Sequence, residues 1–261
     1  MRLNGNPTLR RVINRSAKGE YSALDPNRVA TMGGMISKSA MLCSVVAVAA
    51  IVAAVLLNRF VDTQNEGALT VMLLLLAASA IPMFVLSIII IFAPGAAKVL
   101  APIYCLFDGM AIGVVSGLVD MFYPGIAFMA FLGTILVFLV TLIVFRVVGQ
   151  RLSHKFRAFF FISLFSIFAL ELIAYLLSLF IPAVGAFFAN PWIQIGISAL
   201  TILWATFMLL IDMDNMKRLE ATRVDKKYEW LAAFALTTTL VWIYMEILEL
   251  LLKILSIANR K

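Results

Sequence analysis

Charged residues are scarce in this chain. Of its 261 residues, 13% are charged and 63% are hydrophobic, whereas an ordinary globular domain has about 25% charged residues. So few charges cannot cover a fold that faces water on all sides. The composition therefore excludes a soluble domain and makes lipid the main solvent.

Residues with metal or redox chemistry are also few. The single histidine, His154, lies in a basic loop, which favours a surface histidine over a metal ligand. Cys43 and Cys105 lie inside apolar runs, where cysteine behaves as a small hydrophobe, so no disulfide framework is inferred. We expect no resident metal and no cofactor. Because no helix carries paired His or Asp ligands, an intramembrane enzyme is the weakest of the functional hypotheses.

Long apolar runs are abundant. A helix needs about 20 apolar residues to cross a hydrocarbon core of about 30 Å. Seven runs meet this length: Ile36–Asn58, Ala68–Phe92, Val99–Val119, Tyr123–Arg146, Phe156–Ile181, Pro191–Asp212 and Glu229–Leu255. The sequence predicts an all-α polytopic membrane protein, with a flexible basic tail over residues 1–35 and a seven-helix transmembrane domain over residues 36–261.

Basic residues are distributed unevenly along this layout. Most of the 21 lysines and arginines lie in the N-terminal segment and in the connections 94–98, 146–157 and 217–227. By the positive-inside rule, the N-terminus is cytoplasmic and the C-terminus lies on the opposite face. Orientation and anionic headgroups explain the net charge of +7, so the lipid bilayer is the expected partner and nucleic acid is not.

Small residues recur on the third run. Gly109, Gly113 and Gly117 follow one another at four-residue intervals and share one helical face. Such a face lets a second backbone approach closely, which is how helices associate in lipid. The spacing predicts a packing helix.

Five acids lie within or at the edge of the apolar runs, where an ionised carboxylate costs at least about 2.5 kcal/mol and usually marks function: Asp108, Glu171, Asp212, Glu246 and Glu249. Glu249 has Lys253 four residues on, which favours a helical ion pair. Asp108 and Glu171 are each interpreted in two ways, as a possible pathway acid or as a protonated or hydrogen-bonded packing residue. Asp214, at the loop edge, is interpreted as a solvated surface pair with a nearby basic residue.

Asp212 and Glu246 are the most informative acids. Asp212 has no cation three or four residues away in either direction. Glu246 lies on one polar stripe of an otherwise apolar helix, so the stripe is expected to face the bundle interior. Two carboxyls brought together there titrate as a unit. Our hypothesis is a proton-sensitive latch, held by a shared proton and opened by ionisation, which leaves a transient cation site.

The final third of the chain resembles the Bax inhibitor family, the transmembrane Bax-inhibitor-motif proteins, in the branch found in bacteria. The resemblance rests on these stretches: LLIDMDNM at 209–216, EWLAAFAL at 229–236, LVWIYMEILELL at 240–251, with DGMAIG at 108–113 and YPGI at 123–126.

The resemblance implies a fold with the last helix at the centre and a pH-sensitive calcium leak controlled by two carboxylates on the final two helices. On this chain these would be Asp212 and Glu246. The family commonly has aspartate at the second position, so glutamate adds a methylene. With a hairpin tip near Arg223, Asp212 is 11 residues before the tip and Glu246 is 23 after it. Straight antiparallel helices would then offset the two by about 18 Å. Contact would need a later tip, a tilted last helix or a bend near 237–239.

Several functions stay open at this point. The first hypothesis is a cation leak channel, permeable to protons or calcium, in a bacterial cytoplasmic membrane. The second is a non-conducting modulator of another membrane protein, such as a quality-control protease, acting through the basic tail and loops. A secondary transporter is harder to exclude, although no matched pair of broken helices indicates one.

Overall fold

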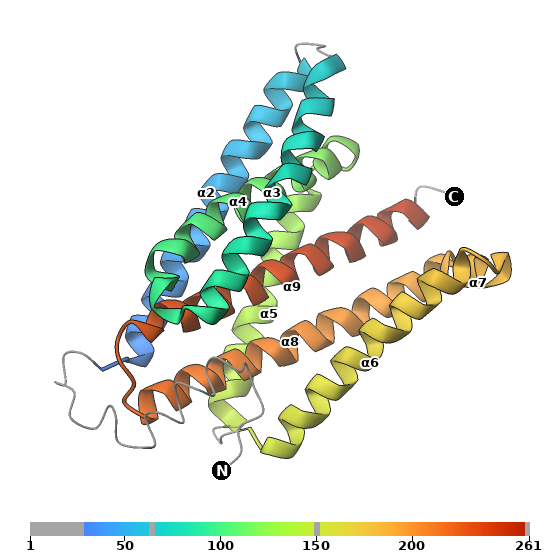
Figure 1. Ribbon diagram of the computed structural model, residues 1–261. Coiled ribbons are helices and arrows are strands. Elements are labelled where there is room, and N and C mark those ends of the chain that lie inside the picture. Colours follow the sequence, from blue (N-terminus) through green and yellow to red (C-terminus); the bar gives the residue numbers. More distant parts are fainter. Residues whose placement is uncertain (1–28, 63–65, 149–151, 259–261) are drawn as a thin grey trace. The chain divides into compact units, whose positions relative to one another are not determined.

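The computed structural model describes residues 29–62, 66–148 and 152–258, and in these ranges the chain is all-α and forms no strand (Figure 1). The elements are α2 (Met32–Asp62), α3 (Glu66–Phe92), the 3-10 turn η2 (Pro94–Ala96), α4 (Ala97–Phe122), α5 (Ile126–Val148), α6 (His154–Ser178), α7 (Pro182–Phe188), α8 (Pro191–Ala221) and α9 (Tyr228–Ala258). Each of the seven predicted runs falls on one long helix, and the short α7 lies between two of them.

Five of these helices are long and apolar enough to cross a membrane: Met32–Arg59, Pro94–Phe122, Ile126–Val147, His154–Ser178 and Pro191–Ala221. They also expose large apolar side chains, such as Phe159 and Phe165 on α6, at 65% and 71%. Exposed apolar surface of this extent requires an apolar environment. The protein is an integral membrane protein.

Local sequence sets several helix boundaries. Helix α6 begins after Ser153, whose hydroxyl accepts the Phe156 N–H at 3.1 Å, as an N-cap residue does. In the turn before α5, Gly125 has a φ of +86°, which glycine adopts without steric cost, and its N–H donates to the Asp120 carboxylate at 2.8 Å. These caps fix where adjacent helices begin and end.

The long helices extend beyond their predicted bounds at one end or both, and the largest extensions are at α2 and α8. Helix α2 begins at Met32 instead of Ile36, and α8 continues to Ala221 instead of ending at Asp212. Most of the added residues of α8, 213–221, are polar or charged, so hydropathy alone could not include them. The connection between α8 and α9 therefore covers residues 222–227, with Arg223 at a φ of +48°.

The described residues divide into two compact units. One unit contains residues 29–127 and 212–238, and the other contains residues 128–211 and 239–258. Helices α8 and α9 have 31 residues each and contribute to both units.

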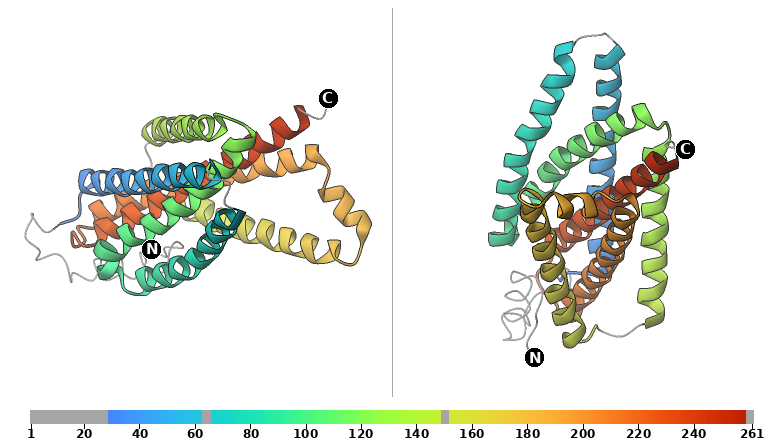
Figure 2. Two further views of the ribbon diagram at one scale, coloured as in Figure 1. Left: turned by 90° about the horizontal axis from the view of Figure 1, so that it is seen from above. Right: turned by 90° about the vertical axis from the view of Figure 1, so that its right-hand side faces the viewer.

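In the first unit, the glycine face of α4 lies against α2, and Figures 1 and 2 show the two helices side by side. A Cβ added to Gly109 would overlap the Val46 carbonyl, and one added to Gly113 would overlap the Ala50 carbonyl. The backbones are thus close enough that only glycine fits at these positions.

Candidate functional site

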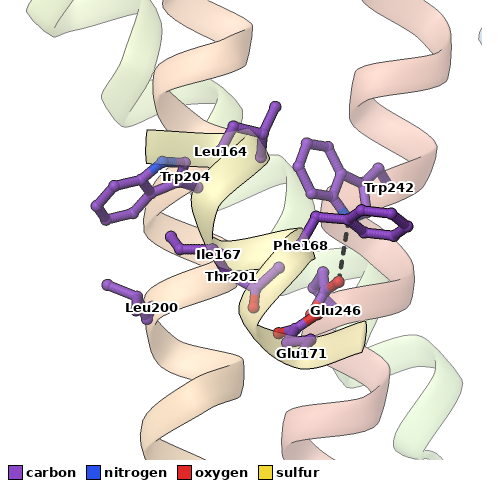
Figure 3. Close-up of a pocket in the computed structure, with 9 residues that line it drawn as sticks. All are labelled: Leu164, Ile167, Phe168, Glu171, Leu200, Thr201, Trp204, Trp242 and Glu246. Atoms are coloured by element: carbon purple, nitrogen blue, oxygen red, sulfur yellow. Dashed lines mark hydrogen bonds between the residues drawn. The ribbon is translucent and has the colours of Figure 1, made fainter. Parts of the chain in front are cut away.

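A pocket of about 210 Å³ lies in the second unit, and α6, α8 and α9 supply its walls (Figure 3). Most of its lining is aliphatic or aromatic, but it also contains two carboxylates and a hydroxyl. The lining residues are Leu164, Ile167, Phe168, Glu171, Leu200, Thr201, Trp204, Trp242 and Glu246. Two of the acids selected from the sequence therefore reach one cavity.

Glu246 is half-buried on α9, and the Trp242 indole N–H donates a hydrogen bond to its Oε1 at 3.0 Å. The two residues are one helical turn apart, so the helix itself brings donor and acceptor together. Trp242 thereby orients the carboxylate within the pocket. The polar stripe predicted for α9 supplies this contact.

Glu171 is the second carboxylate of the pocket and extends from α6. Figure 3 shows the oxygen-bearing side chains of Glu171, Thr201 and Glu246 at one end of the cavity. The Thr201 hydroxyl donates to the Ile197 carbonyl at 3.0 Å, so its oxygen can act only as an acceptor toward a ligand. Carboxylate and hydroxyl oxygens are the ligands that hard cations such as calcium prefer.

The predicted pair at the end of α9 is present. The Lys253 ammonium lies 2.6 Å from Glu249 Oε1 and also donates to the buried Ser198 hydroxyl on α8 at 2.7 Å. Glu249 is thus neutralised by its own helix, as the sequence indicated. Lys253 also ties α9 to α8 within this unit.

The remaining predicted acids belong to the first unit. Asp212 is 3% exposed on α8, and Asp108 is 8% exposed on α4, next to the glycine face. Asp212 belongs to the first unit and Glu246 to the second, so their pairing as one site stays a prediction. The predicted offset between Asp212 and Glu246 along the last two helices therefore stays a prediction as well. The connection between these helices covers residues 222–227, so the hairpin tip does not lie as late as Glu229.

One prediction about the polar end of α8 is wrong. Asp214 pairs with Arg218, whose Nε lies 2.8 Å from Asp214 Oδ2, but the pair is buried, with side chains 1% and 10% exposed. The sequence indicated a solvated surface pair. Because α8 continues to Ala221, both residues lie on a helix packed inside the unit and not on a loop.

Glu229 was missed in the sequence, where it served only to mark the start of the last run. It is 0% exposed, forms an ion pair with Lys38, and accepts the Thr31 N–H at 2.8 Å. Lys38 could have indicated it, because a lysine inside an apolar run needs an anionic partner.

No group of three or more His, Cys, Asp or Glu side chains that could hold a metal ion occurs in the described part of the chain. The pocket of Glu171 and Glu246 therefore offers two carboxylates and a hydroxyl, a set suited to brief contact with a cation.

The chain was compared with models of known families. A family model described as Bax inhibitor 1 like matches residues 6–256, nearly the whole chain. No curated protein and no solved structure matches the chain significantly.

Proposed function

Because the chain belongs to the Bax inhibitor 1-like family, we propose that it is a pH-sensitive cation leak channel. In this proposal calcium is the permeant ion, and Asp212 and Glu246 gate the channel and bind the ion transiently. The setting is a bacterial cytoplasmic membrane, with seven spans, the last helix at the centre and the N-terminus in the cytoplasm.

The observation that supports this function best is the position of Glu246. A carboxylate on an apolar helix is costly in lipid unless it faces protein or water. Glu246 lies in a pocket with Glu171 and is held by one indole N–H at 3.0 Å. One indole donor leaves most of the carboxylate's acceptor capacity for a proton or a cation.

The two pocket carboxylates give the proposal its pH dependence. Glu171 and Glu246 line one cavity, and a proton competes with a cation for the same carboxylate oxygens. Ionisation as the pH rises creates the cation site and separates the helices by repulsion. Calcium flux should therefore increase with pH.

The test is calcium influx into vesicles that contain the purified full chain. Asp212→Asn and Glu246→Gln are expected to lower influx by about tenfold or more, because each removes a carboxylate from the pathway. Glu249→Gln is the matched control, since Glu249 is 55% exposed and paired with Lys253. Equal influx in all three variants and in the unaltered chain would show that these carboxylates do not carry the ion.

A modulator of another membrane protein is the second candidate function. It is favoured by the position of residues 29–30, where the Ala30 N–H donates to the Val224 carbonyl at 2.8 Å. In this alternative, a partner binds the basic segment that precedes these two residues. Deleting residues 1–28 removes the basic segment and keeps both residues of the Ala30–Val224 contact. Loss of a cellular effect with unchanged calcium influx in this variant would support the modulator.

A further inference from the structure

The N-terminal end of α2 is bound to both sides of the α8–α9 connection within the first unit. Val29 and Asp225 form an isolated antiparallel bridge. Three consecutive backbone N–H groups then donate to this region: Ala30 to the Val224 carbonyl, Thr31 to Glu229 and Met32 to Glu220, each at 2.8 Å.

These contacts satisfy donors that the helix itself cannot satisfy. The first N–H groups of an α-helix have no acceptor in their own helix, and carboxylates are stabilising near this positive end. Glu220 supplies one carboxylate from the end of α8, and Glu229 supplies the other from the start of α9. The N-terminus of α2 is thus capped by the end of α8 and the start of α9, which are both distant from α2 in sequence.

Glu229 on α9 also neutralises a cation on α2, Lys38. Its Oε2 forms an ion pair with Lys38, whose ammonium lies 5.5 Å from the centre of the Trp230 ring. Glu229 is 0% exposed, and a buried carboxylate that loses its cation becomes strongly unfavourable. The Glu229 carboxylate therefore forms both the ion pair with Lys38 and the hydrogen bond with the Thr31 N–H.

The backbone of α2 leaves space for that side chain. A Cβ added to Gly34 would overlap the Glu229 carboxylate, whereas one added to Gly33 would meet no atom within 4 Å. The two adjacent glycines thus differ in their distance from the Glu229 carboxylate. Gly34 allows the carboxylate to approach, and Gly33 does not contact it.

We propose that Glu229 is the central residue of a conformational clamp that joins the N-terminal end of α2 to the α8–α9 connection, so that these contacts open together and restrain the last helix. We define the clamp as Ala30, Thr31, Met32 and Lys38 on one side and Glu220, Val224 and Glu229 on the other. The restraint on the last helix rests on the proposed leak function, and in that context the closed clamp keeps the leak low.

Amide hydrogen exchange of the full chain in lipid nanodiscs tests the clamp without reference to conduction. Glu229→Gln removes the ion pair but keeps an oxygen acceptor for Thr31. If the contacts open together, exchange becomes faster by about tenfold or more at Ala30, Thr31 and Met32 alike. Faster exchange at Thr31 alone, or no change at any of the three, would overturn the clamp.

Two glycine variants test the clamp without changing Glu229, and they apply even if Glu229→Gln does not fold. Gly34→Ala forces the carboxylate aside, and Gly33→Ala adds the same methyl group one residue earlier without contact. We expect faster exchange at Ala30 and Met32 in Gly34→Ala only. Equal exchange in the two variants would contradict the clamp.

Calcium influx measured on the same two variants tests the restraint. We expect Gly34→Ala to leak several-fold more than Gly33→Ala. Faster exchange without a change in influx, in a preparation whose unaltered chain conducts, would refute the restraint and leave the leak function standing. If the unaltered chain does not conduct, the leak function and the restraint both fail, whereas exchange still decides whether the clamp exists.

Discussion

A carboxylate removed from water needs a cation or several hydrogen-bond donors beside it, and the buried acids of the first unit differ in how they meet this need. Glu229 pairs with Lys38 across two helices. Asp214 pairs with Arg218 on the same helix. In the other unit, Glu246 has a single indole donor in a pocket that it shares with Glu171. This difference is why we assign structural roles to the first two and ion contact to Glu246.

The buried pair on α8 gives a prediction about stability. Arg218→Met leaves the 1% exposed Asp214 side chain without this guanidinium, and removing one partner of a buried pair costs about 3–5 kcal/mol. We expect a large drop in the thermal unfolding temperature in detergent. Lys217→Met, at the adjacent exposed position, should change it far less. Similar losses in the two variants would show that burial of the pair does not matter.

Residue type and depth identified some acids from the sequence but not others. Glu246 and Glu171 were selected because they interrupt apolar runs, and the structure brings both to one pocket. The Glu249–Lys253 pair followed from i, i+4 spacing. Glu229 and Lys38 are separated by 191 residues, and no local pattern reports a contact at that separation. Long-range pairing is a property of the fold and not of the local sequence.

At the scale of the elements, hydropathy located the long helices of the described ranges, and five of them are long and apolar enough to cross a bilayer. It could not locate the polar extension of α8 from residue 213 to residue 221, because that part of the helix is stabilised by packing instead of lipid. The glycine spacing on α4 indicated a packing face but could not name its neighbour. The structure assigns that neighbour as α2.

The contact between α2 and α4 predicts how a small substitution acts. Gly113→Ala places a methyl group against the Ala50 backbone, and overpacking of this kind costs about 1–3 kcal/mol. Gly196→Ala on α8 meets no atom within 4 Å and should stabilise its helix by about 1 kcal/mol. Thermal unfolding in one detergent compares the two. An equal or higher unfolding temperature for Gly113→Ala would contradict the close approach.

At the scale of the whole molecule, the proposed seven spans fix which connections share a face. With the N-terminus in the cytoplasm, Lys155 lies on the cytoplasmic side and Asn190 lies on the opposite side, and both are exposed. In a chain without Cys43 and Cys105, an impermeant thiol reagent should label Asn190→Cys in intact cells. It should label Lys155→Cys only after permeabilisation. The reverse pattern would invert the orientation, and labelling of both from outside would refute the span count.

The central claim, that Glu246 makes the leak sensitive to pH, is tested most directly by calcium influx into vesicles across a pH series. The unaltered chain should conduct more as the pH rises, because ionised carboxylates form the cation site. Glu246→Asp keeps a carboxylate and should keep the dependence, whereas Glu246→Gln should lower influx and flatten its pH profile. A profile for Glu246→Gln with the same amplitude and midpoint as the unaltered chain would contradict the claim.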